Sequence, residues 1–497
     1  MKHFEHYIGG RWVPPASSSY DDVLNPYTGQ VWARVARGDA TDVERAVAAA
    51  QEALSGPWSK LTASQRGGLL RRMGDLLATE ADEYAKVQVQ ENAKPIAETL
   101  PQTLNAPAWL YYYAGLADKI EGRLLPFDRT DHFAFTRYEP LGVVAAITPW
   151  NSPLRLLLWK LAPALAAGNT LVVKPSEVSP VSTLMLAELA QRAGLPAGVF
   201  NVITGTGVDV AEPLASHPEV AKLAFTGGGR NGRRVSLAAA ERFCPITLEL
   251  GGKSPNIIFD DSDVDAAVVG AAAAIFGSTG QTCLAGSRLL VHESIYERVV
   301  EGLVRIAASV RHGDPADMST EYGPIPVKAQ YEAVLQHIAV AQREGARVAY
   351  GGHALTGPQC AAGLFVSPTV LVDVTSAMQV WREEVFGPVV CVMPFSDDEE
   401  ALRIANDSSY GLAAGVWTAD LNRALDMSFR LKAGVVWVNG YRITSPTMPF
   451  GGYKASGLGR EGGAEMIREY LQVKSVCINM SGQITTPFKM TDGHYAN

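Results

Sequence analysis

The sequence predicts an α/β protein with two domains, each built on a largely parallel sheet. Short runs of β-branched residues alternate with longer apolar runs that are typical of helices, first from Gly142 and again from about Ser254 to Ser456. Strands and helices that alternate in this way form parallel sheets covered by helices. At 497 residues, the chain is also too long for a single hydrophobic core.

The segment before this alternation is predicted to be mainly helical as far as Lys119. It opens with HYIGGRWVPP, in which apolar and polar residues alternate around a Gly pair and predict a short hairpin. Two capping-box patterns then open amphipathic runs, because a Thr and an acid or amide three residues later can satisfy free helical amides. They are Thr41 with Glu44, and Thr62 with Gln65.

The predicted strands end close to small or polar residues, and ligands in such folds bind beyond the carboxyl ends of the strands. Residues 120–139 are predicted to be a strand-rich excursion, and the residues from Ser475 onward a polar tail. The strand-like runs are GVVAAIT, NTLVVK, VFNVIT, KLAFT, PNIIF, RLLVHES, VVCVMPF and GVVWVNG.

Composition argues against nucleic acid and membranes as partners. The net charge is −8 with a pI near 5.7, and no long run of Lys and Arg makes a basic stripe. The longest apolar stretch, Ala266 to Phe276, is much shorter than the roughly 20 residues that span a bilayer, and it predicts a buried helix. The N-terminus has no apolar core of signal-peptide length.

The five cysteines are scattered, odd in number and never spaced as Cys-x-x-Cys. This pattern disfavours a disulfide framework or a zinc knuckle and fits a reducing, cytoplasmic environment. The nine histidines show neither HExxH nor another paired spacing, so no metal site is predicted.

Cys283 ends the segment GQTC, between an apolar helix and a strand. A reactive cysteine needs thiolate character, and the backbone amides of a loop can stabilise a thiolate. From the residue alone, an inert buried cysteine is the more common outcome. The same holds for Cys244, Cys360, Cys391 and Cys477.

Two other polar side chains follow predicted strands. Glu249 lies between leucines in LELGGK, where desolvation would raise its pKa toward general-base duty; pairing with a Lys or an amide is an equally good interpretation. Asn151 ends TPWN, and its amide can donate to an oxyanion without adding a titratable charge. On the segment alone, a turn-forming Asn is favoured.

Two turns have the residues that bind nucleotides. KPSE, Lys174 to Glu177, follows the strand TLVVK, where a carboxylate can accept ribose hydroxyls. Residues 227–232 match GxGxxG between a strand and a helix, and their amides can cradle phosphate. A tight turn without a ligand explains the second pattern nearly as well.

Taken in order, these segments closely resemble the non-acylating, NAD(P)-dependent members of the aldehyde dehydrogenase superfamily. The resemblance implies an aldehyde dehydrogenase-like α/β fold with two Rossmann-like domains and a small oligomerisation arm. It also implies the oxidation of an aldehyde to a carboxylic acid. The motifs that carry it span nearly the whole chain: YIGGRW, NPYTG, TPWN, LVVKPSE, FTGG, LELGGKSP, GQTC, EEVFGPV, WVNGY and PFGGYKASGLGRE.

The resemblance implies catalytic roles residue by residue. Cys283 would attack the aldehyde to form a thiohemiacetal, which becomes a thioester after hydride transfer. Asn151 and the backbone N–H of Cys283 would hold the oxyanion. Glu249 would activate the water that hydrolyses the thioester, and Lys160 and Glu461 would relay its proton.

The implied cofactor is NAD, because Glu177 would repel the 2′-phosphate of NADP, although relatives with KPSE can use both. Glu384 would bind the nicotinamide ribose. The cofactor site of the family is a variant of the Rossmann site, so the GxGxxG match is not taken as evidence for it. Gly228 stands where the family usually has a Ser near the pyrophosphate. The implied cofactor residues are Thr148, Trp150, Lys174, Ser176, Glu177, Gly207, Phe225, Thr226, Gly227, Gly228, Gly232, Leu250, Glu384 and Phe386.

The resemblance divides the chain into three parts and implies a homodimer or homotetramer. Residues 1–119, 141–251 and 456–473 would form the NAD-binding domain, and 252–455 the catalytic domain. Residues 120–140 and 474–497 would form the oligomerisation element and tail. The tail after Gly482 is expected to cross onto a neighbouring subunit.

The implied substrate tunnel is largely apolar and suits an aromatic or medium aliphatic aldehyde. Arg155 or Arg442 can instead bind a carboxylate and select a semialdehyde, although a salt bridge is the favoured interpretation of both. A betaine-type substrate would need an aromatic cage, which the sequence supports only in part. Thr444 stands where several relatives carry an aromatic residue. The implied tunnel residues are Leu156, Trp159, Thr282, Leu284, Thr444 and Phe450, with Arg155 and Arg442.

Two other functions are alternatives to a hydrolytic aldehyde dehydrogenase. A CoA-acylating relative would share the fold and the cysteine but would not need a hydrolytic base, so Glu249 favours water as the acceptor. A catalytically silent structural member is disfavoured, because Cys283, Asn151 and Glu249 are all present.

Overall fold

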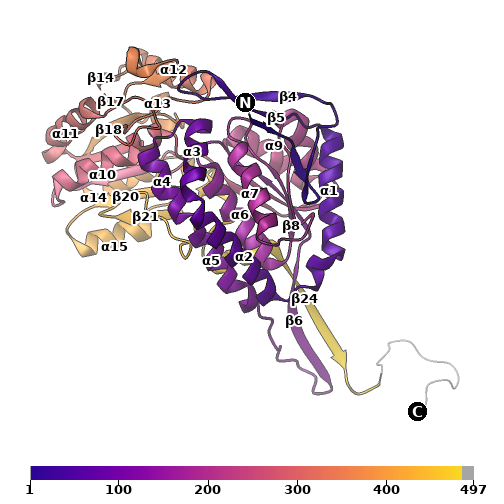
Figure 1. Cartoon of the computed structure of the whole chain (residues 1–497). Coiled ribbons are helices and arrows are strands. Elements are labelled where there is room, and N and C mark those ends of the chain that lie inside the picture. Colours follow the sequence, from indigo (N-terminus) through magenta and orange to yellow (C-terminus); the bar gives the residue numbers. More distant parts are fainter. Residues whose placement is uncertain (1, 484–497) are drawn as a thin grey trace.

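The computed structural model describes residues 2–483, which form two sheet-based units and a projecting arm (Figure 1). In the first sheet the five central strands are parallel, and both edges are antiparallel. Its strand order is β23 (Gly457–Leu458), β11 (Ile246–Glu249), β10 (Val220–Thr226), β7 (Val143–Ile147), β8 (Thr170–Lys174), β9 (Phe200–Val202), β2 (His6–Ile8) and β3 (Arg11–Val13).

The second sheet is parallel except at β14. Its strand order is β14 (Arg347–Tyr350), β17 (Thr369–Val372), β18 (Val389–Phe395), β13 (Arg288–His292), β12 (Pro255–Ile258), β20 (Ala413–Trp417) and β21 (Val435–Val438). The chain passes between the sheets at LGGKS, and β23 later returns to the first one. The α/β architecture predicted from the sequence is confirmed. We propose that the domain boundary lies in this linker.

Alternating side chains of the first sheet pack into different helical layers, because successive residues of a strand point to opposite faces. Val144 and Ala146 of β7 belong to the core shared with α2 (Ala63–Thr79), α3 (Ala81–Asn92), α5 (Pro107–Leu116), α6 (Pro153–Ala167) and α7 (Val181–Arg192). Val143 and Ala145 contact the layer of α1 (Ala40–Ser55), α8 (Glu212–Ser216) and α9 (Gly229–Ala240).

The second sheet is covered in the same way. One core contains α10 (Val264–Phe276) and α11 (Tyr296–Ser309). The other contains α12 (Lys328–Arg343), α13 (Gln379–Arg382), α14 (Asp398–Asn406) and α15 (Leu421–Arg430). The helix predicted over residues 266–276 is therefore confirmed as α10.

The arm consists of β6 (His132–Pro140) and β24 (Leu471–Asn479), which pair antiparallel along their full length and project from the body (Figure 1). The strand-rich prediction is confirmed for the second half of residues 120–139. The tail predicted to begin at Ser475 was wrong at its start, because β24 continues to Asn479. The segment expected to cross onto another subunit lies almost wholly outside the described residues.

The helix starts show where local prediction succeeds. The Thr62–Gln65 capping box is present at α2. The Thr41–Glu44 box was wrong, because α1 is capped by Asp39. The Asp39 carboxylate accepts from the amide of Thr41 at 2.8 Å, and Asp42 closes the box. The predicted hairpin is confirmed as β2–β3, with both residues of its Gly pair at positive φ.

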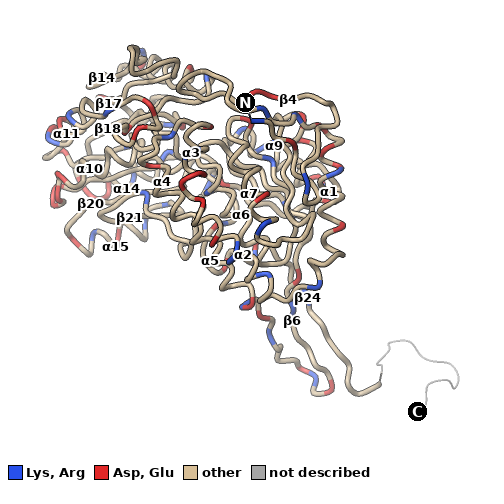
Figure 2. The backbone as a smooth tube through the Cα atoms, in the orientation of Figure 1, with Lys and Arg blue, Asp and Glu red and all other residues tan. Residues whose placement is uncertain are grey.

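No helix among residues 2–483 is long and apolar enough to cross a bilayer. Figure 2 shows acidic and basic residues interspersed along the described chain.

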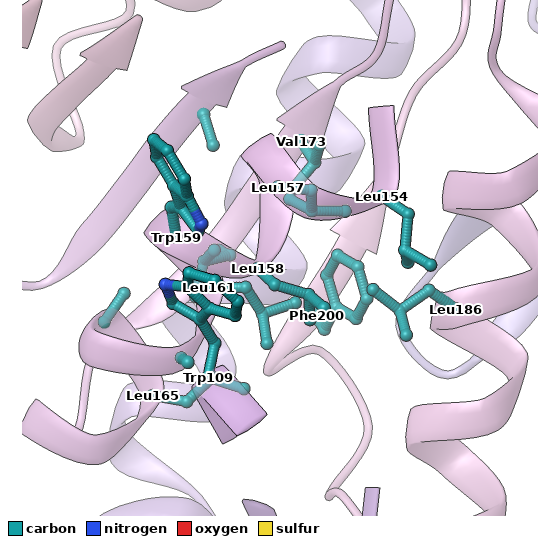
Figure 3. Close-up of a cluster of buried hydrophobic side chains, with 14 of the residues drawn as sticks. Trp109, Leu154, Leu157, Leu158, Trp159, Leu161, Leu165, Val173, Leu186 and Phe200 are labelled. Carbon is teal, nitrogen blue, oxygen red and sulfur yellow. The ribbon is translucent and has the colours of Figure 1, made fainter. Parts of the chain in front are cut away.

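Helix α6 supports the whole first unit, because nearly all of its residues are buried. Figure 3 shows Leu154, Leu157, Leu158 and Leu161 of this helix among buried neighbours. The preceding turn carries Asn151, so the helix also fixes part of the candidate site.

We expect Leu158→Ala to lower the free energy of unfolding by about 2–5 kcal/mol, because it empties a fully buried position. Leu24→Ala is the matched control: Leu24 is 52% exposed, and its loss should cost less than about 0.5 kcal/mol. Urea unfolding followed by tryptophan fluorescence measures both. Equal shifts of the two midpoints would contradict this account of the core.

Candidate active site

The motif-bearing turns meet at one edge of the first sheet. Parallel pairing aligns Ile147 of β7 with Lys174 of β8 and with Phe225 of β10, and aligns Thr226 of β10 with Glu249 of β11. TPWN, KPSE, TGGG and LGG therefore leave the sheet side by side, where a ligand is expected to bind.

Cys283 reaches this edge from the second unit. It follows α10 and the 3-10 turn Gly277–Gly280, and it packs against the core of the first unit. The amide of Asn151 donates to the carbonyl of Gln281 at 3.0 Å, two residues before Cys283. Burial raises the pKa of Cys283 to about 12, and the negative charges of Glu249 and Glu384 add to this effect.

Two glycines make this approach possible. A Cβ on Gly251 would lie 2.0 Å from a carboxylate oxygen of Glu384, and a Cβ on Gly252 would lie 2.6 Å from the carbonyl oxygen of Cys283. Any side chain here would push the cysteine loop and Glu384 away from the first sheet. The Gly pair of LELGGK is therefore a packing requirement of the site.

Glu249 is buried, and neither carboxylate oxygen has a hydrogen-bond partner among the described residues. Its pKa is raised well above the usual range, chiefly by burial and then by the charge of Glu461. No residue of 2–483 forms a salt bridge with Glu249. The alternative expectation from the sequence, that Glu249 pairs with a Lys or a backbone amide, therefore does not describe this structure. An oxygen of Glu249 would lie 2.7 Å from a Cβ on Gly451, a further position where only glycine fits.

Lys160 and Glu461 form a buried ion pair close to Glu249. The Lys160 ammonium donates to the Glu461 carboxylate and, at 2.6 Å, to the hydroxyl of Thr226. The backbone of Glu461 pairs with that of Phe450, which ties this acid to the wall of the substrate cavity. A buried pair of this kind is held only because both charges are compensated.

The turns at the strand ends next to the cysteine carry groups that fit a dinucleotide. The hydroxyl of Thr148 is buried without a partner among the described residues, and α9 begins at Gly229 with no side-chain cap on its free amides. Free amides at a helix N-terminus bind phosphate. Lys174 and Glu177 pair at 2.9 Å, and both lie at the end of β8, where the adenosine ribose is expected.

Glu384 and the neighbouring rings of Trp150 and Phe386 fit the nicotinamide half of the cofactor. Glu384 accepts from the amide of Gly252 at 3.0 Å, and burial raises its pKa to about 7. The rings of Trp150 and Phe386 meet edge to face at 5.7 Å.

Other cofactor residues predicted from the sequence lie just after strands of the first sheet. Gly228 leaves open space where a usual Ser would project, and a Cβ on Gly232 would clash with Leu250. Ser176 is buried in the turn after β8, and its hydroxyl accepts from the amide of Val178. Gly207 opens the turn over residues 207–211.

A small, largely aromatic cavity contains three of the residues that the sequence predicts for the substrate tunnel: Trp159, Thr444 and Phe450. Trp159 stacks on Trp109 at 5.9 Å and packs against Phe450 at 5.0 Å. Leu156 and Leu284 belong to the hydrophobic core behind it, while Thr282 is not part of the cavity wall. The wall consists of Trp109, Trp159, Thr444, Ser445, Met448, Phe450, Glu461 and Gly462. Sequence reasoning missed Trp109, because α5 carries no motif and comes close only through tertiary packing.

The match to known proteins covers this chain almost completely. The family model described as "Aldehyde dehydrogenase family" matches residues 12–476. The chain belongs to the aldehyde dehydrogenase family. A curated relative is the (Z)-2-((N-methylformamido)methylene)-5-hydroxybutyrolactone dehydrogenase of Acinetobacter baylyi, 44% identical, with 99% of this chain and 100% of the relative covered.

Solved structures of similar proteins agree. A putative aldehyde dehydrogenase from Burkholderia cenocepacia superposes with a TM-score of 0.96 at 42% identity, covering 99% of this chain and 100% of the other. Betaine aldehyde dehydrogenase from Staphylococcus aureus in complex with NAD+ has a TM-score of 0.96 at 39% identity, with 98% and 96% covered. An NAD+ complex from Bacillus cereus has 0.94 at 41%, with 97% of each chain covered.

Arg155 and Arg442, the two arginines that could bind a substrate carboxylate, have different environments in this aldehyde dehydrogenase. Arg442 forms a salt bridge with Glu98 at 2.8 Å, as the competing interpretation of the sequence expected. Arg155 donates to the hydroxyl of Thr444 and lies against two tryptophan rings. Among the described residues, no group of three or more His, Cys, Asp or Glu side chains is placed to hold a metal ion.

We expect the alkylation of Cys283 by iodoacetamide to accelerate about tenfold per pH unit between pH 7 and 10 without levelling off, because only the thiolate reacts and its pKa is raised to about 12. A small thiol with a pKa of about 8.5 levels off within this range and serves as the reference. Cys283→Ala measures the contribution of the other cysteines. A plateau below pH 9 would refute the raised pKa.

Proposed function

We propose that this chain oxidises an aldehyde to a carboxylic acid with NAD, through a thioester on Cys283. The observation that carries the proposal is the convergence of Asn151, Glu249 and Cys283. The amide of Asn151 donates to the carbonyl of Gln281, two residues before Cys283, and the buried carboxylate of Glu249, which has no hydrogen-bond partner among the described residues, lies close enough to raise the pKa of Cys283. Membership of the aldehyde dehydrogenase family supports the reaction type.

The first step needs a thiolate and a site for the oxyanion. The sulfur of Cys283 attacks the carbonyl carbon, and the aldehyde oxygen becomes an alkoxide in a thiohemiacetal. The amide of Asn151 has two N–H groups, and one of them is occupied by Gln281. The second is free to donate to the alkoxide together with the backbone N–H of Cys283, without adding charge to the site.

The groove beyond the sheet edge would hold the cofactor. When bound, NAD accepts the hydride that leaves the carbon on Cys283. Lys174 and Glu177 would hold the adenosine ribose, the α9 N-terminus the pyrophosphate, and Glu384 the nicotinamide ribose. The NAD+ complexes of the S. aureus and B. cereus relatives support this assignment.

Hydrolysis of the thioester needs a base, and the raised pKa of Glu249 makes its carboxylate a stronger base than that of an ordinary glutamate. Glu249 would take a proton from water as the hydroxide adds to the acyl carbon, and the sulfur of Cys283 leaves. The proton would then pass toward Glu461 and Lys160, which form a buried polar path behind Glu249. This base makes water, rather than CoA, the expected acyl acceptor.

The aromatic cavity supports an aromatic or medium aliphatic aldehyde. A second candidate, a carboxylate-bearing semialdehyde, is favoured by the free Arg155. It is also favoured by the A. baylyi relative, whose name specifies a 5-hydroxybutyrolactone. In general chemistry, such a lactone is the ring-closed form of a 4-oxo acid, a semialdehyde.

We further propose a cytoplasmic homodimer or homotetramer joined through the arm. Phe133, Val473 and Ile478 leave apolar surface exposed along β6 and β24. Apolar surface on a projecting two-stranded element is typical of an interface between subunits.

We expect Glu249→Gln to produce about one equivalent of NADH per Cys283 in a burst and then almost none, because the thioester forms but lacks its base. Intact-protein mass spectrometry should show the acyl adduct. Since the base acts as a carboxylate, the hydrolysis step of the unaltered enzyme should slow as the pH falls toward its raised pKa. Cys283→Ala is the control and should give neither burst nor adduct. Steady turnover by Glu249→Gln would refute the assignment.

We expect Glu177→Gln to raise the ratio of kcat/KM for NADP to that for NAD by about tenfold, because it removes the charge that repels a 2′-phosphate and frees Lys174. Glu188→Gln, at an exposed position of α7, is the matched control and should leave the ratio unchanged. Initial rates with both cofactors measure the effect. An unchanged ratio in Glu177→Gln would contradict the role of this carboxylate.

A further inference from the structure

A cluster of charged side chains lies against the substrate cavity and is unbalanced. Lys94 lies just before α4 (Ile96–Asn105) and Glu98 in its first turn. Arg155 comes from the first turn of α6, and Arg442 from the turn after β21. The cluster thus has three cations for one carboxylate. The four charges influence one another's pKa values, so they form one electrostatic unit.

Glu98, the single carboxylate of the cluster, already has several hydrogen-bond partners. Glu98 accepts from Arg442 at 2.8 Å, from the amide of Ser278 at 2.7 Å and from Gln102 at 2.9 Å, and also from the Ser278 hydroxyl. Despite its burial, Arg442 and Lys94 lower the pKa of Glu98 to about 2. Gly277 makes room for this pair, because a Cβ there would overlap the Arg442 guanidinium. Glu98 and Arg442 therefore neutralise each other.

Lys94 has no anionic partner among the described residues. It is 9% exposed, and its ammonium donates to the hydroxyl of Ser152 at 2.8 Å and to the amide oxygen of Gln102 at 3.2 Å. Burial lowers its pKa to about 8. Ser152 follows Asn151, the residue proposed to hold the oxyanion.

Arg155 likewise meets no carboxylate among residues 2–483. Its guanidinium lies 5.5 Å from the ring centre of Trp109 and 5.6 Å from that of Trp159 and donates to Thr444; its Nε is buried without a partner. Trp109, Trp159 and Thr444 all line the substrate cavity. Figure 3 shows the two tryptophans side by side. Burial and then Arg442 lower the pKa of Arg155 to about 10.

Two buried cations without an anion are costly, and the cost is offset when an anion binds between them. We propose that Arg155, assisted by Lys94, binds the carboxylate of a short ω-oxo acid whose aldehyde end meets Cys283. The proposal rests on the proposed aldehyde oxidation and names its substrate class. The two rings hold the guanidinium flat, which suits a bidentate carboxylate. We expect a short chain, because the Lys94 ammonium donates to Ser152, the residue that follows Asn151.

The test compares 4-oxobutanoate with its uncharged methyl ester. We expect the unaltered enzyme to prefer the acid. In Arg155→Gln, kcat/KM for the acid should fall about 100-fold, the size expected for losing one partner of a desolvated charge pair. The value for the ester should fall far less, and Arg155→Lys should recover part of the preference. Arg71→Gln, at an exposed position of α2, is the matched control and should not change the ratio.

A second measurement is independent of turnover. Succinate, which has a carboxylate at each end, should protect Cys283 from iodoacetamide, and Arg155→Gln should abolish this protection, whereas equal ionic strength from sodium chloride should not protect. Equal losses on acid and ester would overturn the proposal and place Arg155 in support of the Cys283 thiolate. Equal rates of the unaltered enzyme on both would overturn it in favour of an uncharged substrate. If neither is oxidised but benzaldehyde is, the short ω-oxo acid is overturned as substrate while the proposed aldehyde oxidation stands. If benzaldehyde is not oxidised either, the proposed function fails, and the protection assay alone decides the anion site.

Discussion

The close contact between the Gly251–Gly252 linker and the second unit is the constraint on which the site depends. This linker joins the last central strand of the first sheet to the first strand of the second. On one side it receives the Glu384 carboxylate, and on the other the carbonyl of Cys283. Cys283, the proposed nucleophile, comes from one unit, while Asn151 and Glu249, the proposed oxyanion donor and base, come from the other. The linker therefore sets the distance between groups that belong to separate cores.

Burial without compensation gives the site its chemistry. Of the acids Glu249, Glu384 and Glu461, only Glu461 forms a salt bridge among the described residues, with Lys160. Glu249 is left unpaired, and its raised pKa follows from this difference rather than from any special feature of the glutamate. The same surroundings raise the pKa of Cys283. In the free enzyme, the charges of Glu249 and Glu384 disfavour the thiolate of Cys283. Binding of cofactor and substrate would change these surroundings, so we expect binding to be coupled to activation of the nucleophile.

The sequence allowed the architecture and most of the strand-end residues to be predicted, because period, turn residues and strand order are local signals. The cap of α1 was predicted wrongly although it is also a local signal, because Asp39 caps the amides of Thr41 and Asp42 and so starts the helix two residues before the predicted cap. Other features depended on long-range packing. Nothing near Trp109 marks it as a neighbour of Trp159, and nothing near Glu98 shows that it holds Arg442 and leaves Arg155 free. Which arginine is neutralised is a property of the fold.

That division has a consequence for how substrate preference can change within this scaffold. Glu98 is the only carboxylate in the cluster, and it is shared among Arg442, Ser278 and Gln102 rather than placed against Arg155. An acidic residue near Thr444 would neutralise Arg155 and favour an uncharged aldehyde, without touching Cys283, Asn151 or Glu249. On the proposed mechanism, the contact at the Gly linker sets the reaction, whereas the charge balance at the start of α6 selects the substrate, so the two can vary independently.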